Sequence, residues 1–477
     1  MNLRKDAAKG VAWTSIGTLG SGVLNLFVTI ILARILTPKD FGIIELLVVF
    51  AGISDIIVDS GFSQAIIRDR YCSNKDLSSV FWFNFGIGFF LYTLLFFSSP
   101  HIAAFYDAPI MENLSRIVFL TIVFNSLSVV QNAKFSRELN FKPYSIACIC
   151  AIIISGTIAV FLAKSGWGIW ALAVNLAGFS FLRMSILWLF SSWYPHFVFS
   201  LSSIRKYFKF SVNLLIQGLL DKIVTNLESL IIGKIYTKKQ LGFFSQGRKL
   251  DSYVTQASTN IVVKVSYPLL AKVQDDPQRL KEGYRTIVGV TMCAIAPIMM
   301  IMFCGAKYIM NGVFGSQWLP AAPYLRLWAI CGLSLIIYSI FSNIFLVKGR
   351  SKLLLKCSIA KQVLRIAAIV ALVHISIMHM MYGIVVVTLI TGLIYIYFGG
   401  KLINYPLKDF FCDISGSLFG IILSGTISYL ATPLLTANEG ILGLCILVVI
   451  ASLLYISILL LIKNKYFKIL TSFITKR

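Results

Sequence analysis

The feature that most restricts the fold of this chain is a succession of apolar stretches, each long enough to cross a lipid bilayer. A membrane-spanning helix needs about 20 apolar residues, and such windows recur along the 477 residues with short connections between them. Only 13% of the residues are charged, about half the share in a soluble protein. Too few polar residues remain to cover a large extramembrane domain. The sequence therefore predicts an all-α polytopic membrane protein.

We expect about fourteen transmembrane helices. The apolar windows lie near residues 11–35, 41–62, 78–99, 113–131, 144–163, 166–190, 207–235, 241–265, 285–303, 320–347, 353–373, 380–398, 414–432 and 441–462. The basic N-terminal segment precedes an apolar run that is too long for a cleaved signal peptide and has no small-residue cleavage site after it. We therefore expect the first span to be retained.

The distribution of basic residues predicts the orientation of the chain. Most of the 43 Lys and Arg residues fall in the two termini and in the even-numbered connections, and few fall in the odd-numbered ones. Because cytoplasmic loops collect Lys and Arg, both termini are expected in the cytoplasm. The net charge of +24 then follows from topology, and nucleic acid is not an expected partner.

Two turns of similar sequence indicate an internal repeat. Residues 33–42 read ARILTPKDFG and residues 233–242 read GKIYTKKQLG. Both lie where the first two spans of a six-span block meet. Because six is even, the two blocks enter the membrane from the same side, which gives parallel six-helix repeats related by an axis along the membrane normal. We predict an N-lobe over 1–200, a C-lobe over 201–400, and two peripheral helices with a basic tail over 401–477.

The first of these turns carries a resemblance to a known family. LARILTPKDFG, followed by Asp59-Ser60-Gly61 and Ala65-Ile66-Ile67, resembles the polysaccharide transporters of the MOP (multidrug/oligosaccharidyl-lipid/polysaccharide) superfamily, nearest to exporters of the Wzx type and of the colanic- or teichuronic-acid type. The resemblance extends over most of the chain, including its length and its two lobes. It implies a flippase, not an enzyme.

The resemblance also implies a substrate and a partner. The substrate would be an undecaprenyl-diphosphate-linked oligosaccharide, an O-antigen or exopolysaccharide repeat unit. The protein would move it across the bacterial inner membrane by alternating access between the two lobes, and the polysaccharide polymerase machinery is an expected partner.

Cations near the middle of the membrane are the candidate substrate-binding residues. A lipid diphosphate keeps its negative charge at neutral pH, so the protein must supply counter-charge along the path. Depth along the spans, at about 1.5 Å per residue, selects Lys222, Arg248, Lys249, Lys361 and Arg365. All five belong to the second lobe, so we expect an asymmetric site. Thr18, Asn25 and Gly52 of the first lobe are then predicted to face the sugar hydroxyls.

Carboxylates inside the spans are the candidate coupling residues. They are Asp55, Asp59, Asp221, Glu228 and Asp251. A membrane-buried carboxylate can exchange a proton or bind Na⁺, and it can equally well only neutralise a nearby cation. Both interpretations stay open. No other cofactor and no metal site are expected, because the four histidines are scattered and most of the cysteines lie in apolar runs.

Three arginines lie nearer the membrane boundaries. For Arg116, Arg183 and Arg326 we expect the side chain to snorkel toward water.

Two other functions compete with the flippase. A cation-coupled multidrug exporter of the same superfamily would favour carboxylates in its cavity, whereas cations outnumber acids in these spans. A membrane glycan polymerase or glycosyltransferase would need a catalytic cluster in a substantial loop, and the predicted outer loops are too short for one.

Overall fold

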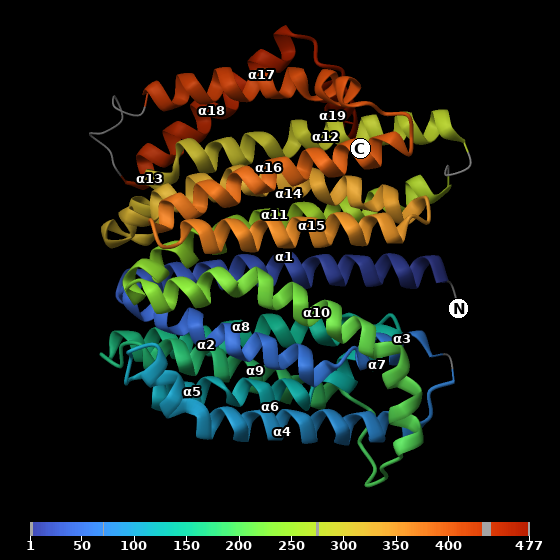
Figure 1. Cartoon of the computed structure of the whole chain (residues 1–477), viewed down its shortest axis with the longest axis vertical. Coiled ribbons are helices and arrows are strands. Elements are labelled where there is room, and N and C mark those ends of the chain that lie inside the picture. The colour runs from blue at the N-terminus through green and yellow to red at the C-terminus, as the bar shows by residue number, and fades with distance from the viewer. Residues whose placement is uncertain (1–2, 70, 273–275, 432–439, 476–477) are drawn as a thin grey trace. The chain divides into compact units, whose positions relative to one another are not determined.

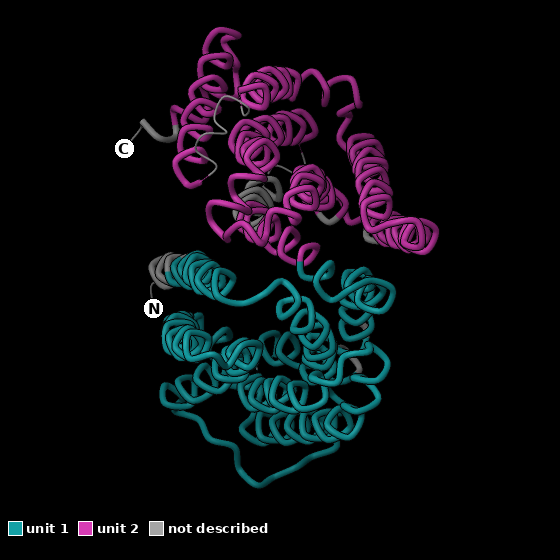
Figure 2. Tube along the Cα trace, turned by 90° about the vertical axis from the view of Figure 1, so that its left-hand side faces the viewer, with its two compact units in different colours: residues 1–242 teal, residues 243–477 magenta. Residues whose placement is uncertain are grey.

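The computed structural model describes residues 3–69, 71–272, 276–431 and 440–475, and all regular elements in these ranges are helices. The chain divides into two compact units, residues 1–242 and 243–477, which Figure 2 shows in different colours. Each unit is a bundle of helices that are mostly long. The expected all-α architecture is confirmed.

Unit 1 contains ten helices over its described residues, of which the longest cross the whole bundle (Figure 1). They are α1 Leu3–Ile35, α2 Pro38–Asp59, α3 Phe62–Arg68, α4 Asn74–Phe105, α5 Met111–Val118, α6 Leu120–Ser126, α7 Val129–Arg137, α8 Lys142–Lys164, α9 Trp170–Phe190 and α10 Leu201–Ile235.

Unit 2 begins within α11 and continues to the end of the chain. Its elements are α11 Lys238–Lys272, α12 Pro277–Cys304, α13 Ala306–Tyr308, the π-helix η1 Ile309–Phe314, the 3₁₀-helix η2 Ser316–Ala321, α14 Ala322–Val347, α15 Ser351–Leu372, α16 Ile377–Lys401, α17 Leu407–Ala431, α18 Ile441–Leu461 and α19 Lys465–Thr475.

Eleven helical segments of the described chain are long and apolar enough to cross a membrane. The predicted spans over 207–235, 241–265 and 353–373 also form long helices, α10, α11 and α15, but these three do not meet the same criterion of length and composition. These three helices also carry the five cations singled out above as candidate substrate-binding residues. The chain is a multi-pass membrane protein whose most polar long helices carry the candidate site.

Two predicted spans are interrupted. Ser60 and Gly61 both adopt the left-handed conformation, with φ of 47° and 74°, so α2 ends at Asp59 and α3 starts anew. A side chain on Gly61 would also come within 3.1 Å of α10 atoms, so the position requires glycine. The expected single helix over 113–131 is wrong in detail: it is split into α5, α6 and α7.

The two similar turns have the same hydrogen bonds. Thr37 caps α2 and exchanges bonds with Asp40, whose carboxylate accepts from the Thr37 backbone N–H at 2.9 Å. Thr237 pairs with Gln240 in the same way, and the amide oxygen of Gln240 accepts from the Thr237 N–H at 3.1 Å. These are capping boxes, so the two copies share a local structure as well as a sequence.

The two turns also contact each other within unit 1. A Cβ on Gly42 would overlap the carbonyl oxygen of Lys238, and a Cβ on Gly242 would overlap the carbonyl oxygen of Pro38. The contact is reciprocal, because Pro38 and Lys238 occupy the same position in the two copies. Glycine at both sites lets the backbones approach this closely.

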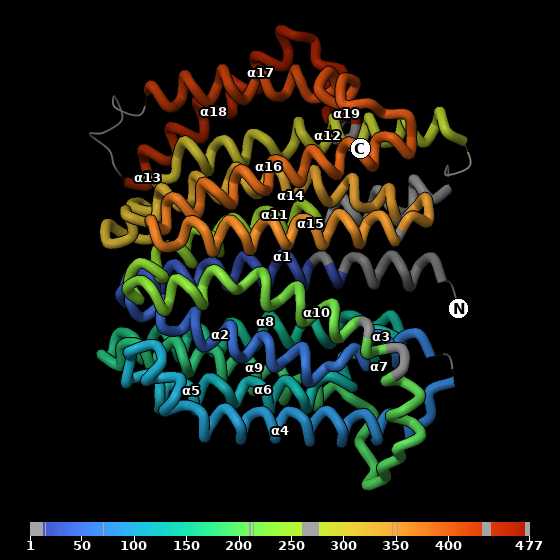
Figure 3. The backbone as a smooth tube through the Cα atoms, in the orientation of Figure 1, coloured from blue at the N-terminus to red at the C-terminus, as the bar shows by residue number. Residues whose placement is uncertain are grey.

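The boundary between the units falls after Gly242, because α10 packs against α2, α3 and α4 (Figure 3). The predicted lobes, by contrast, divide at residues 200 and 400. That division follows the repeat and stays a prediction. In its contacts α10 belongs to unit 1.

A buried carboxylate fixes the C-terminal helix of unit 2. Asp413 on α17 accepts two hydrogen bonds of 2.7 Å from Arg285 on α12. The hydroxyls of Tyr405 and Tyr466 donate to the same carboxylate at 2.8 and 2.6 Å. Burial and these bonds raise the pKa of both tyrosines above the usual range, so they remain donors. The cluster joins α12, α17 and α19.

Candidate functional site

The five candidate cations lie on the three long helices that are too polar to count as ordinary spans. Lys222 lies on α10, Arg248 and Lys249 on α11, and Lys361 and Arg365 on α15. All five side chains are half-buried. Because α10 packs in unit 1, Lys222 is surrounded by the helices of the first block, although its position in the sequence belongs to the second.

Lys222 reaches across to α2. A Cβ on Gly52 would lie 2.7 Å from its Cε and 3.0 Å from its Nζ, so the absence of a side chain at Gly52 makes room for the ammonium group. The Lys222 charge is also close enough to interact with the carboxylate of Asp55, one turn further along α2. The predicted residues Lys222, Gly52 and Asp55 are therefore brought together.

Asp55 belongs to a chain of hydrogen bonds that links three helices. Its two carboxylate oxygens each accept from Asn125 Nδ2 on α6, at 3.0 Å. Asn125 Oδ1 in turn accepts from Arg183 Nη2 on α9, at 2.7 Å. We call Asp55, Asn125, Arg183 and Lys222 the unit 1 polar cluster.

The snorkelling interpretation is wrong for Arg183. Its guanidinium lies 5.2 Å from the centroid of the Phe179 ring and donates to Asn125 inside the bundle. The sequence analysis did not single out Asn125. Its polar amide in the middle of an apolar span could have indicated a functional residue. The expectation of one uninterrupted helix over 113–131 gave no reliable helix face for Asn125.

The remaining candidate acids of unit 1 lie in different environments. Asp59 accepts from the backbone N–H and the hydroxyl of Ser63, at 3.1 and 2.6 Å, and so caps the first turn of α3. Asp221 is exposed. Glu228 is fully buried next to Ser229, whose hydroxyl donates at 3.3 Å to Glu45 on α2. Glu45 is a further carboxylate within a span that the sequence analysis did not single out.

Thr18 and Asn25 are exposed on α1. They are seven residues apart and therefore share a helix face. An adjoining face of α1 packs on α8, where Val28 fills the space above Gly156. The role of Thr18 and Asn25 toward sugar hydroxyls stays a prediction.

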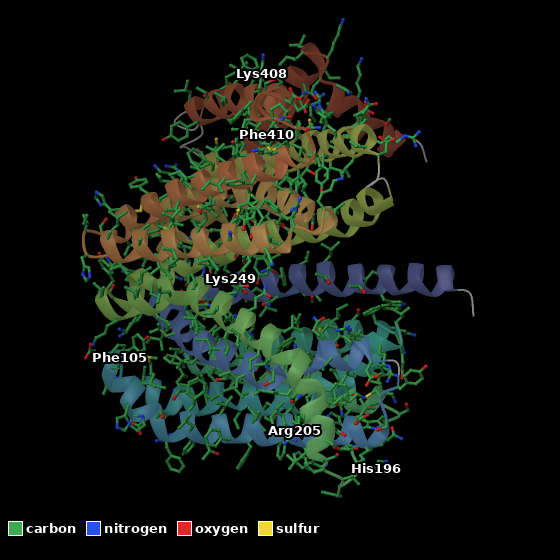
Figure 4. All side chains as sticks on the ribbon, turned by 45° about the vertical axis from the view of Figure 1, so that its right-hand side comes forward. Phe105, His196, Arg205, Lys249, Lys408 and Phe410 are labelled. Carbon is green, nitrogen blue, oxygen red and sulfur yellow. The ribbon has the colours of Figure 1, made fainter. Side chains whose placement is uncertain are left out.

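In unit 2, Arg248 and Lys249 are consecutive on α11. The guanidinium of Arg248 lies 5.7 Å from the centroid of the Phe244 ring, and Lys249 is labelled on the same helix in Figure 4. Asp251 is buried against Gly332 of α14, and its carboxylate accepts from Thr255 at 3.2 Å. Asp251 thus has a polar neighbour on its own helix.

Lys361 and Arg365, one turn apart on α15, line one small pocket. The Lys361 ammonium lies 4.3 Å from the centroid of the Tyr338 ring, a cation–π contact. The rest of the lining combines two aliphatic side chains, Leu335 and Val387, with the hydroxyl-bearing side chains of Ser334, Tyr338, Thr388 and Thr391. Two cations beside hydroxyl groups can meet phosphate oxygens and sugar hydroxyls with the same set of donors.

The fold places this chain in a known structural class. The structure titled "Lipid II flippase MurJ, inward closed conformation" superimposes with a TM-score of 0.74 and 16% sequence identity, covering 94% of this chain and 98% of that one. A multidrug resistance MATE family transporter of the MOP superfamily, in an inward-facing conformation, gives a TM-score of 0.59 at 14% identity, over 82% of this chain and 98% of that one. The fold is that of MOP superfamily transporters.

The family itself is defined by the sequence. A family model described as "Polysaccharide biosynthesis protein" matches residues 31–323, which is more than half of the chain. The chain belongs to this family, as the resemblance at the first turn implied.

Two curated relatives are similar over most of their length. The teichuronic acid biosynthesis protein TuaB of Bacillus subtilis (strain 168) is 24% identical over 74% of this chain and 73% of its own. The lipopolysaccharide biosynthesis protein WzxC of Escherichia coli (strain K12) is 24% identical over 78% of this chain and 76% of its own.

Proposed function

We propose that this protein is a flippase that moves an undecaprenyl-diphosphate-linked oligosaccharide across the bacterial inner membrane by alternating access. The observation that carries the proposal is the placement of Lys222, Arg248, Lys249, Lys361 and Arg365 on α10, α11 and α15 of a chain whose other long helices are apolar. The membership in a family of polysaccharide biosynthesis proteins supports it.

The charge of the substrate explains why the cations are retained. A charged group in the hydrocarbon region is costly, so such residues persist where they serve a pathway or a partner. A diphosphate needs positive charge to leave water, and the hydroxyl-lined pocket of Lys361 and Arg365 combines that charge with hydrogen-bonding groups. The sugar hydroxyls of the substrate need those hydrogen-bonding groups.

A multidrug exporter remains the second candidate, because MATE family transporters share the fold. Three of the predicted acids have polar neighbours: Asp55 is bonded to Asn125, Asp59 to Ser63 and Asp251 to Thr255. Lys361 on α15 lies beside an aromatic ring, in a pocket whose lining includes hydroxyl groups. These contacts suit an anionic substrate better than a cationic one.

The test is flipping of a fluorescent undecaprenyl-diphosphate-linked oligosaccharide in proteoliposomes made with the full-length protein. Arg248→Gln and Arg365→Gln should each reduce the flipping rate by tenfold or more, because each removes a charge-assisted contact worth about 1.5–3 kcal/mol. Arg116→Gln is the matched control, since Glu112 already neutralises Arg116 at 2.9 Å. Normal flipping by a variant lacking all five cations would refute the site.

Assays on the same preparation separate the alternatives. Export of a cationic dye without any flipping of the lipid-linked sugar would favour the multidrug exporter. Transfer of sugar between lipid carriers by the purified protein would favour a glycosyltransferase or polymerase.

For energy coupling we propose Asp55 as the residue that responds to a proton or sodium gradient. It lies within range of two cations, Lys222 and Arg183, and is held by Asn125. Asp59 caps a helix turn. Asp55→Asn should therefore change the dependence of transport on the ion gradient, whereas Asp59→Asn should lower only stability. An unchanged gradient dependence in Asp55→Asn would contradict this assignment.

The proposed orientation places both termini and the basic connections in the cytoplasm. The turns at 36–40 and 236–240 would then lie outside. Single-cysteine labelling in a cysteine-free background tests this, and labelling of position 238 only from the cytoplasmic side would contradict it.

A further inference from the structure

Unit 2 contains an apolar cavity of about 550 Å³ between α12, α14 and α17. Its walls include Met299, Met300, Leu333 and Gly425. The volume lies in the range of small-ligand sites. Two further lining residues on α17, Ile422 and Leu430, are 66% and 68% exposed, so the cavity opens on an apolar outer surface of the helix, where lipid chains can enter.

Among the described residues that line this cavity, Arg326 is the one with a charged side chain. Its guanidinium lies 5.6 Å from the centroid of the Tyr429 ring, and its Nε is buried without a hydrogen-bond acceptor. Among the residues that the structure describes, no carboxylate lies within ion-pair distance of it. The side chain is half-buried, and its Nε is closed off from water. A partly buried charge without a counter-charge is costly, and an anion in the cavity would relieve that cost.

A second arginine, Arg116 of unit 1, shows how such a charge can be compensated. Arg116 lies in the fourth span of the first block, as Arg326 does in the second, and it also faces an aromatic ring, Phe96, at 4.8 Å. There Glu112 supplies a carboxylate at 2.9 Å from the preceding turn, and Asn113 a further bond at 3.0 Å. The residue one turn before Arg326 is Ala322.

We propose that this cavity binds an anionic phospholipid, with an acyl chain in the apolar space and the headgroup phosphate on Arg326. Arginine and phosphate form charge-assisted, bidentate hydrogen bonds. A free anion would gain nothing from the apolar walls, whereas a lipid uses both parts of the site.

The single charge also distinguishes a phospholipid from the transported substrate. A phosphodiester carries one negative charge, which one arginine neutralises. A diphosphate with attached sugars needs more cations and many hydroxyl partners, and the lining offers little beyond Thr426 and Tyr429. A zwitterionic lipid brings an ammonium group, which Arg326 repels. The site therefore selects a net anionic headgroup.

The experiment measures lipid binding by the full-length protein in detergent micelles. Phosphatidylglycerol and phosphatidylcholine are titrated separately, and both thermal unfolding and native mass spectrometry are recorded. Wild type should bind phosphatidylglycerol in preference to phosphatidylcholine and should unfold at a higher temperature with it. Arg326→Gln should weaken phosphatidylglycerol binding by about fivefold, the value of one basic residue near a membrane surface.

Two further variants make the result specific. Thr426→Trp, at an exposed position on the rim, should narrow the cavity and weaken binding of phosphatidylglycerol without touching the charge. Arg116→Gln should leave binding unchanged. Equal phosphatidylglycerol binding by wild type and Arg326→Gln would overturn the proposal.

The same assay distinguishes a phospholipid from two other phosphate-containing ligands, inorganic phosphate and undecaprenyl phosphate. Stabilisation by inorganic phosphate alone, lost in Arg326→Gln, would mean a simple anion site and overturn the proposal. Displacement of phosphatidylglycerol by equimolar undecaprenyl phosphate, dependent on Arg326, would assign the cavity to the carrier lipid and also overturn it. Flipping of the lipid-linked sugar is measured separately, in phosphatidylcholine vesicles, so the failure of either proposal is recognised independently.

Discussion

Asn125 donates to both carboxylate oxygens of Asp55, at 3.0 Å each, and so fixes the position of a charge inside the membrane-spanning part of unit 1. The orientation of the amide follows from its two neighbours. A carboxylate accepts only, and a guanidinium donates only, so the nitrogen faces Asp55 and the oxygen faces Arg183. One uncharged residue thus bridges two opposite charges and hydrogen-bonds to both.

Replacing Asn125 with leucine should break the hydrogen bonds that link Asp55 to Arg183. Both charged partners would lose a buried hydrogen bond, at a cost of about 2–4 kcal/mol in unfolding free energy, and transport should fall by at least tenfold. Thermal unfolding and export assays in cells check both expectations. Asn132→Leu on α7 is the matched control, since Asn132 is half-buried and makes no side-chain hydrogen bond within the described residues. Equal behaviour of the two variants would contradict the role of Asn125.

The close approach of the two repeat turns gives a second prediction. In Gly42→Ala the new methyl group overlaps the Lys238 carbonyl, and such overpacking costs about 1–3 kcal/mol. Gly86→Ala on α4 should be neutral or stabilising by about 0.5–1 kcal/mol, because nothing lies within 4 Å of the new atom and alanine favours a helix. The two variants are compared by thermal unfolding in the same detergent. A Gly42→Ala protein as stable as wild type would show that the turns do not need this contact.

The Asp413 cluster predicts a large effect on stability. Asp413→Asn removes the charge that accepts hydrogen bonds from Arg285, Tyr405 and Tyr466, and weakening these charge-assisted bonds should cost about 2–4 kcal/mol. Asp409→Asn, which breaks the more exposed pair with Lys281 at 2.9 Å, should cost about 1 kcal/mol or less. Protease sensitivity of α19, together with the melting temperature, measures the difference. Similar losses in the two variants would contradict the cluster's role in fixing α19.

Acid should weaken the contact between α10 and Asp69, which follows α3. Hydrogen bonds from Lys206 and Tyr207, at 2.6 and 2.7 Å, lower the pKa of Asp69 from 3.8 to about 2. Because the folded-state pKa is the lower one, the stabilisation is complete above about pH 4 and is lost as the pH falls through 2. The stability gap between wild type and Asp69→Asn should therefore be constant above pH 4 and close toward pH 2. Lys206→Gln should reduce the gap, since Lys206 is the main cause of the shift; a gap independent of pH would refute this account.

The fold was predictable from the sequence because a membrane span depends on the summed hydropathy of consecutive residues. A window of about 20 apolar residues has few alternatives to a membrane span, so even α10, α11 and α15 were located despite their charges. The breaks were harder to predict. The turn at Ser60-Gly61 is visible as sequence, but its interruption of a span depends on how closely α10 approaches Gly61.

The site was predictable only in part, for a different reason. Periodicity places Lys222 and Asp55 on particular helix faces, but which faces meet is decided by packing between helices distant in sequence. Asn125 and Arg183 were missed as partners of Asp55 because they are 70 and 128 positions away from it in the sequence, on helices whose rotation the sequence does not state. The comparison of Arg116 with Arg326 likewise requires the structure, since of these two arginines only Arg116 has a carboxylate within ion-pair distance among the described residues.

The reciprocal contact of Gly42 with Gly242 has the form of an isologous interface, in which each of two equal surfaces presents the same residues to the other. Such an interface normally joins two copies of one chain, yet here both copies belong to a single polypeptide. A substitution at either glycine meets the same obstacle, so neither copy can change without harming the contact they share. The two decapeptides are therefore held to a similar sequence by the contact that they share.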